Sequence, residues 1–151
     1  MEHLAIPQQL LVEHQTLAHV TSALRATIGW KYQGADFTRK LESLRFVGES
    51  FKRHLKHLME LEESDGYMRV VVDSRPELKD DVEALRREHT QFRTALRSMS
   101  GRLRRQVSTD HEVFNVVCAD FLKLLDKLDE HSKKETDLLQ EALLTDEGGE
   151  G

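Results

Sequence analysis

The sequence has 151 residues and a formal net charge of −5, with 32% charged and 38% hydrophobic residues. This composition is typical of one soluble globular domain, and no apolar run approaches the roughly 20 residues that span a bilayer. A single cysteine excludes a disulfide within the chain and a cysteine-rich metal site. The acidic balance argues against nucleic-acid binding. An acidic residue at position 2, where a signal peptide needs a basic one, predicts a cytoplasmic protein.

Apolar residues recur at alternating steps of three and four along four segments of the chain. This spacing is typical of helices that bury one face in a core. The first predicted helix begins near Pro7 and ends at Gly29, because proline favours the first helical turn and glycine follows a helix end. The second begins at Asp36 as its N-cap and ends within residues 64–66. A short helical piece over residues 67–73 is predicted to follow it.

The third helix is predicted over residues 78–99, with Gly101 near its end. Ser74 and Glu77 have the spacing of a capping box, in which a serine and a glutamate three residues later satisfy the first backbone amides. The pair therefore marks the start of this helix.

The fourth helix follows a second capping-box signal, formed by Thr109 and Glu112, and its apolar pattern runs over residues 114–142. Residues 146–151 are acidic and glycine-rich, so they are predicted to be a disordered tail. Four long helices with short connections predict an all-α, antiparallel up-down-up-down four-helix bundle over residues 1–145. No internal repeat or second domain is evident.

Polar side chains occupy seam positions where a bundle core needs leucine or isoleucine; they are His14, Glu62, His89, His131 and Glu135. A buried carboxylate is costly unless it is paired or bound to a metal. Facing helices of a bundle can all project ligands inward, so one cation would remove the combined cost. Imidazole and carboxylate ligands suit iron, manganese or zinc.

Two helices each offer a pair of candidate ligands. His131 and Glu135 are four residues apart, so both side chains lie on one face of the fourth helix. On the second helix, with Leu58 taken as the direction of the core, His54 and Glu62 lie about 40° to either side of it at 100° per residue. Both can then point inward, and His54 joins the predicted ligand set.

The chain resembles the hemerythrin-like, or HHE cation-binding, domain family over about residues 8–143. The matching pieces, in chain order, are Val12-Glu13-His14, Glu62-Glu63, Gly66-Tyr67-Met68, Arg87-Glu88-His89 and Glu130-His131 with Glu135. The resemblance implies a four-helix bundle that holds two non-haem iron ions bridged by oxo or hydroxo groups, with zinc or manganese as alternatives. It implies terminal ligation by the histidines at 14, 89 and 131, and bridging ligation by the glutamates at 62 and 135.

The sequence departs from the family pattern at Leu58, where the family usually has a histidine four residues before the glutamate of the second helix. The third helix also offers one histidine, because the position one turn after His89 is Arg93. The ligand set is therefore one or two short of a full oxygen-carrier site. A di-iron site with open positions, a single-metal site and a degenerate site without metal all stay open.

The resemblance implies a protein that binds or senses iron, dioxygen, or reactive oxygen or nitrogen species, rather than an enzyme. Its small-molecule partner would be dioxygen, another diatomic molecule or a peroxide, and a sensor of this kind would act through a partner protein. The chain is expected to be a monomer or a dimer. The alternative is a metal-free helical interaction module in which the seam histidines are hydrogen-bonded core residues.

Overall fold

The computed structural model describes residues 8–64, 66–107 and 109–148, with side chains as far as residue 142. The four long helices are α1 (Gln8–Gly29), α2 (Asp36–Ser64), α4 (Lys79–Arg105) and α5 (His111–Gly148). A short helix, α3 (Tyr67–Ser74), and a 3-10 turn, η1 (Pro76–Leu78), join α2 to α4. The described residues contain no strand.

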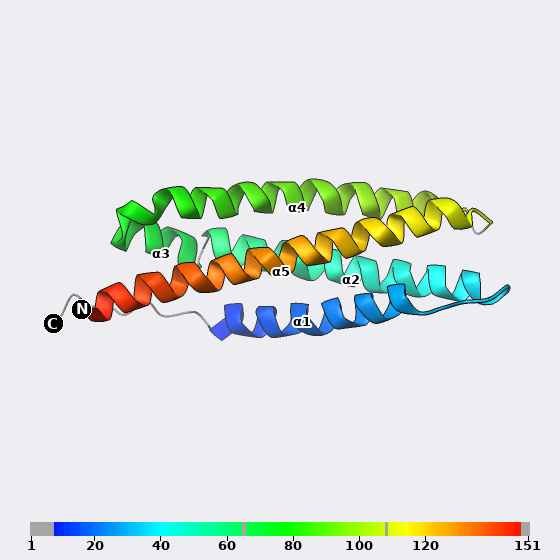
Figure 1. Cartoon of the computed structure of the whole chain (residues 1–151), viewed down its shortest axis with the longest axis horizontal. Coiled ribbons are helices and arrows are strands. Elements are labelled where there is room, and N and C mark those ends of the chain that lie inside the picture. Colours follow the sequence, from blue (N-terminus) through cyan, green and yellow to red (C-terminus); the bar gives the residue numbers. More distant parts are fainter. Residues whose placement is uncertain (1–7, 65, 108, 149–151) are drawn as a thin grey trace.

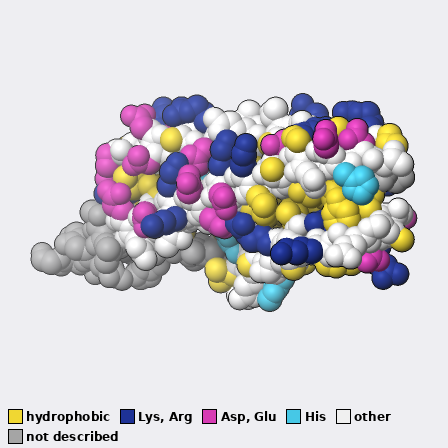
Figure 2. Space-filling view, turned by 45° about the vertical axis from the view of Figure 1, so that its right-hand side comes forward, with side chains coloured by type: hydrophobic (Ala, Val, Ile, Leu, Met, Phe, Trp, Pro, Cys, Tyr) yellow, Lys and Arg dark blue, Asp and Glu magenta, His cyan; other side chains and the backbone are white. Residues whose placement is uncertain are grey.

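The long helices alternate in direction, so each runs antiparallel to the one before it (Figure 1). Helix α1 packs against α2 and α5, and α4 packs against the same two helices. This arrangement confirms the predicted all-α four-helix bundle. Within the described ranges, no helix is long and apolar enough to cross a membrane. Basic and acidic side chains are interspersed over the face seen in Figure 2, with neither sign filling it.

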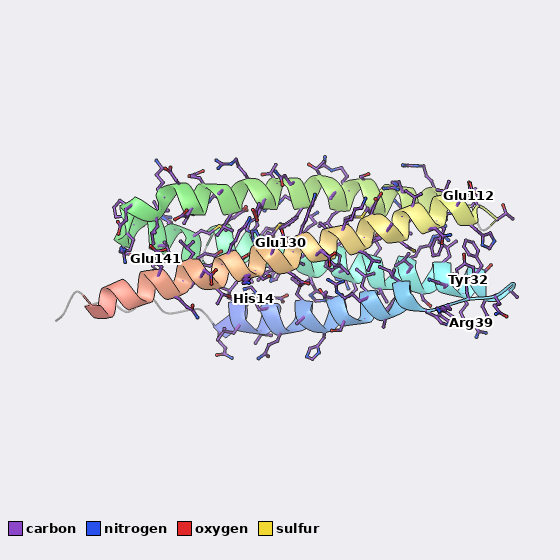
Figure 3. All side chains as sticks on the ribbon, in the orientation of Figure 1. His14, Tyr32, Arg39, Glu112, Glu130 and Glu141 are labelled. Carbon is purple, nitrogen blue, oxygen red and sulfur yellow. The ribbon has the colours of Figure 1, made fainter. Side chains whose placement is uncertain are left out.

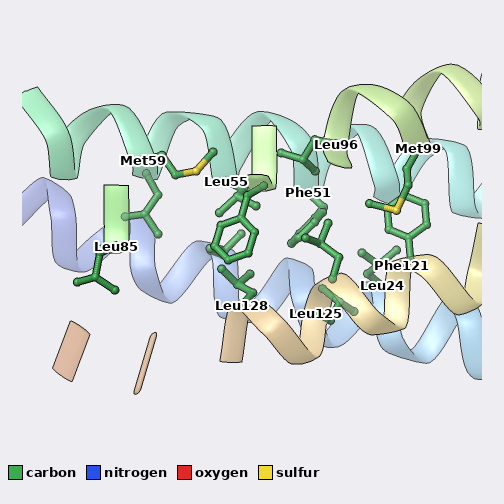
Figure 4. Close-up of a cluster of buried hydrophobic side chains, with 14 of the residues drawn as sticks. Leu24, Phe51, Leu55, Met59, Leu85, Leu96, Met99, Phe121, Leu125 and Leu128 are labelled. Atoms are coloured by element: carbon green, nitrogen blue, oxygen red, sulfur yellow. The ribbon is translucent and has the colours of Figure 1, made fainter. Parts of the chain in front are cut away.

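The core is a continuous apolar column drawn from all four long helices, at the positions that the three-and-four spacing marks. Figure 4 shows its middle part, where Phe51 and Leu55 of α2 face Leu125 and Leu128 of α5. All four side chains are buried. Polar side chains replace this apolar filling toward the end of the bundle where α2 ends.

The four long helices lie where the sequence predicts them, although α4 continues past Gly101 to Arg105. Both capping boxes are wrong. Ser74 ends α3, and its hydroxyl donates to the carbonyl of Val70 instead of accepting from the next helix. Helix α4 starts after η1 without a side-chain cap. At α5, Asp110 takes the place predicted for Thr109, because its Oδ1 accepts the backbone N–H of Val113 at 3.1 Å.

The C-terminal part of α5 extends to Gly148, so its last turn enters the segment 146–151 for which the sequence predicts disorder. Residues 149–151 of that segment lie outside the described part of the chain. That residues 1–145 form a single domain stays a prediction, and residues 1–7 also lie outside the described part.

The end of the bundle near the α1–α2 connection is closed by aromatic rings and a buried lysine. Lys40 Nζ donates to the carbonyl oxygens of Ile28 and Trp30 at 2.7 Å each, which caps the end of α1. It also lies 5.2 Å from the ring centre of Tyr32 and 5.9 Å from that of Phe114. In Figure 3, Tyr32 marks this end, while the labelled residue His14 lies in the other half of the bundle.

Candidate metal centre

Four buried side chains bring one ligand atom each into a single group in the bundle core. They are Glu62 of α2, His89 of α4, and His131 and Glu135 of α5, and their ligand atoms all lie within 4.8 Å of one another. Each side chain is at most 5% exposed. The group therefore joins three of the four long helices at the polar end of the core. Four of the five seam positions predicted from the sequence meet there.

His89 is held by a carboxylate on its outer nitrogen. Its Nδ1 lies 2.9 Å from Glu63 Oε1, and because a carboxylate only accepts, the imidazole donates through Nδ1–H. Arg93 fixes Glu63 in turn by two hydrogen bonds of 3.1 and 2.6 Å. This chain of contacts turns the Nε2 atom of His89 inward, where it lies 3.4 Å from Glu62 Oε1.

His131 has the same arrangement on the opposite side of the group. Its Nδ1 lies 2.8 Å from Glu88 Oε1, and Lys134 Nζ donates to the other oxygen of that carboxylate at 2.8 Å. Its Nε2 points inward, 2.5 Å from Glu135 Oε1. Each buried histidine thus contacts a glutamate through its outer nitrogen, and each of these glutamates contacts an arginine or lysine side chain. Metal-binding histidines commonly have such a carboxylate on the nitrogen that does not bind the metal.

The inward atoms of the group are all hydrogen-bond acceptors when the two histidines are neutral. With both Nδ1 atoms protonated, the Nε2 lone pairs of His89 and His131 face each other across 3.1 Å. The carboxylate oxygens of Glu62 and Glu135 complete the set. Converging acceptors in a buried site need either protons or a cation between them. One metal ion would bind all four atoms at once.

The two carboxylates of the group differ in their affinity for protons. Burial, together with the neighbouring carboxylate of Glu62, raises the pKa of Glu135 to about 7. Burial also acts to raise the pKa of Glu62, but the neighbouring side chains of Glu135, His14 and His89 outweigh it and lower that pKa. The pair therefore holds a proton near neutral pH, which a bound cation would displace.

His14 of α1 approaches the group from the fourth helix. Its Nε2 lies 3.7 Å from Glu62 Oε2, and this neighbouring carboxylate raises the pKa of His14. Glu62 Oε2 is buried and has no hydrogen bond within the described residues. The side chain of His14 is 39% exposed, so it lies between the buried group and solvent.

The structure does not bring His54 into the group. Its Nδ1 lies 3.4 Å from Glu13 Oε2, and His57 Nε2 lies 3.8 Å from the other oxygen of the same carboxylate. Both histidines thus face α1 near the surface. Leu58 is buried in the core at the place where the family pattern has a histidine.

Three further side chains, outside the predicted ligand set, bear on the group. Glu63 and Glu88 hold the two buried histidines, and each directly adjoins a predicted ligand in the sequence, which is the one signal that points to them. Tyr67, the first residue of α3, is 3% exposed. The carboxylates of Glu135 and Glu62 lie near enough to act, after burial itself, to raise its pKa.

The donor chemistry of the group fits a transition-metal ion. Two imidazole nitrogens and two carboxylates suit iron, manganese or zinc, and His14 adds a third nitrogen. The backing glutamates supply the orientation that such ligands require, and the unpartnered Glu62 Oε2 is a buried acceptor that an ion would satisfy.

The family model described as the hemerythrin HHE cation binding domain matches residues 5–143, which is nearly the whole chain. This match confirms the resemblance drawn from the sequence motifs. No curated protein and no solved structure matches the chain significantly.

Proposed function

Because the chain belongs to the hemerythrin HHE cation binding domain family, we propose that it binds iron in the core of the bundle and, through that iron, a small oxygen or nitrogen species. The proposed ligands are Glu62, His89, His131 and Glu135, with His14 as a fifth. His54 is left out of the set because it pairs with Glu13.

The observation that carries this proposal is the orientation of the two buried histidines. Both are fixed by carboxylates on their outer nitrogens, so their inner nitrogens lie 3.1 Å apart, beside two more acceptor atoms. In a metal-free interaction module, the core would gain nothing from two buried carboxylates that share one proton near neutral pH. A cation accounts for the four ligands and for the residues that orient them.

The number of donors favours one ion. Three imidazole nitrogens and one oxygen from each carboxylate fill five positions around a six-coordinate iron and leave one open. Two such ions would need several more donors, and the described residues place the buried, apolar Leu58 where a further histidine would lie. We therefore propose a single-iron site, in place of the iron pair that the resemblance implies.

The open position gives the site its proposed activity. Bound iron supplies a redox-active Lewis acid that can bind dioxygen, peroxide or nitric oxide. The protein's own contribution is to hold the ligands rigidly, to exclude bulk water with the apolar column beside them, and to leave access on the half-exposed side of His14. Sensing would need a partner protein that reads the state of the site.

Iron content tests this proposal directly. The untagged protein is incubated anaerobically with iron(II), freed of excess metal on a desalting column, and measured by elemental analysis together with its absorption spectrum in air. We expect one iron per chain, which rises no further with added iron.

Two outcomes would contradict it. Protein that holds no iron, manganese or zinc after this treatment would favour the metal-free helical module. Two irons per chain, with the absorption of an oxo-bridged pair, would show that the donor count is wrong and that the family's paired site is present.

Glu88 offers a test of the backing carboxylates. We expect Glu88→Gln to lower iron affinity about 10- to 100-fold, because outer carboxylates orient the ligand histidine and raise its basicity. The amide can still accept from His131 Nδ1–H, so the helical content should not change. Competition with a chromophoric chelator measures the affinity, and far-ultraviolet circular dichroism checks the fold.

The matched control is Glu112→Gln, an exposed glutamate in the first turn of α5 at the opposite end of the bundle (Figure 3). It should leave iron affinity unchanged. Equal affinities in the two variants would mean that the contact between Glu88 and His131 has no bearing on metal binding.

A further inference from the structure

Tyr67 has a buried hydroxyl that nothing in the fold explains. The side chain is 3% exposed, and its hydroxyl has no hydrogen-bond partner within the described residues. Leaving a buried donor unpaired costs free energy, so a hydroxyl persists in such a place only where something else offsets the cost. Phenylalanine would fill the same space without that cost.

The chain is built so that this ring stands beside the candidate metal centre. Gly66 precedes Tyr67, and a Cβ atom at Gly66 would lie 2.6 Å from both the Cα of Glu62 and the carbonyl oxygen of Leu61. Only glycine permits this close return of the chain onto the end of α2. The return starts α3 against the last turn of α2, one turn beyond the proposed ligand Glu62.

The electrostatic surroundings of Tyr67 identify its hydroxyl as a proton donor. The carboxylates of Glu135 and Glu62 lie close to it, and an ordinary phenol is neutral near pH 7. A neutral phenol carries one O–H, and the unpaired state of that hydroxyl leaves the proton available. The hydroxyl therefore lies near the proposed iron ligands as a donor that makes no hydrogen bond within the described residues.

We propose that Tyr67 donates a hydrogen bond to the small anion that occupies the open position at the iron, and so determines which ligands the site prefers. This inference rests on the proposed iron site. The preferred ligands are those whose free end carries negative charge and accepts a hydrogen bond, such as azide or peroxide. A neutral ligand with a weak acceptor, such as nitric oxide, gains little from the same contact.

The test compares Tyr67→Phe with the parent protein, both loaded with iron. Azide is titrated into the iron(III) form and followed by visible absorption, and nitric oxide is titrated into the iron(II) form. We expect unchanged iron content, azide affinity lowered about 10- to 100-fold, which is typical of losing a hydrogen bond to a charged acceptor, and nitric oxide affinity changed less than about threefold.

The matched control is Tyr32→Phe, since the chain has two tyrosines and Tyr32 lies at the opposite end of the bundle. The Tyr32 hydroxyl lies 3.1 Å from His111 Nδ1, so its loss should destabilise the fold slightly and leave azide affinity unchanged. A second readout needs no iron. The melting temperature of the metal-free Tyr67→Phe variant should equal or exceed that of the parent, because an unpaired donor is removed.

The possible outcomes distinguish failure of the Tyr67 proposal from failure of the proposed iron site. If the parent protein binds no iron, the proposed site fails, and this inference is overturned with it. If iron content is unchanged in Tyr67→Phe and azide affinity is also unchanged, the site stands and the role of Tyr67 is overturned. Loss of iron from Tyr67→Phe, or a lower melting temperature of its metal-free form, would assign Tyr67 to ligation or to the fold instead.

Discussion

Replacing His131 with alanine is expected to remove most of the iron from the protein. The inner nitrogen of this residue is at the middle of the candidate site, 2.5 Å from Glu135 Oε1 and 3.1 Å from the inner nitrogen of His89. A zinc finger binds its metal by roughly 10–16 kcal/mol through four ligands, so one ligand contributes about 3 kcal/mol, or more than about 100-fold in affinity. Elemental analysis after desalting measures the loss.

Two further variants make this result specific. His131→Gln keeps a side chain of similar length that can contact Glu88, so it separates the loss of the ligand from the cavity that alanine leaves beside Phe92. His54→Ala removes the residue that the sequence placed in the ligand set and the structure places against Glu13. We expect the first variant to lose iron and the second to retain it; the reverse order would relocate the site.

The fold could be predicted from the sequence because it depends on one local property, the spacing of apolar residues along each helix. Helix α2 spans Asp36–Ser64, so it begins and ends where the sequence predicts. The errors arose where structure depends on the neighbouring backbone. Ser74 has the right spacing for a cap, but it still belongs to α3, and its hydroxyl bonds back to that helix. A spacing rule could not anticipate the 3-10 turn that begins at Pro76.

The position of His54 illustrates how sensitive a ligand prediction is to helix phase. The prediction took Leu58 as the direction of the core. The buried residues of this stretch of α2 include Phe51, Met59 and Glu62. At 100° per residue, their mean direction around the helix axis lies about 50° from Leu58, on the side of Glu62. His54 lies about 40° on the other side of Leu58, so it is about 90° from the core and faces Glu13 on α1.

The backing residues of the site could not be predicted for a different reason. Glu63 meets His89 and Arg93 across 26 and 30 residues of sequence, and Glu88 meets His131 and Lys134 across more than 40. Such pairs depend on how far each helix is rotated against its neighbour. The apolar spacing fixes which face of a helix is buried, but it leaves the exact partners of half-buried side chains open.

Restoring the histidine that the family pattern places at position 58 is expected to turn the single-iron site into a two-iron site. Leu58 is buried and lies one turn before Glu62, so an imidazole there would point to the same end of the core. Together with His14, which lies 3.7 Å from Glu62 Oε2, Leu58→His would give a second ion two nitrogens and shared carboxylate oxygens. Iron content should rise from about one to about two per chain.

Electron paramagnetic resonance distinguishes a real pair from an ion bound elsewhere. A lone high-spin iron(III) ion gives a signal, whereas two ions coupled through a bridge lose it, so the signal should fall as the iron content of Leu58→His doubles. Leu44→His buries a histidine in the same helix far from the site and serves as the control. Both variants should be less stable without metal, because each buries an unpaired polar group.

Iron should raise the stability of Leu58→His by more than it raises that of the parent, because iron binds the new histidine in the folded state. Leu44→His should gain no more than the parent does. If Leu58→His keeps one iron and its signal, the missing histidine is not what limits the site. The limit would then lie in Arg93, which occupies the place one turn after His89 and binds Glu63. The positive charge of Arg93 would then oppose a second cation whatever ligand stands at position 58.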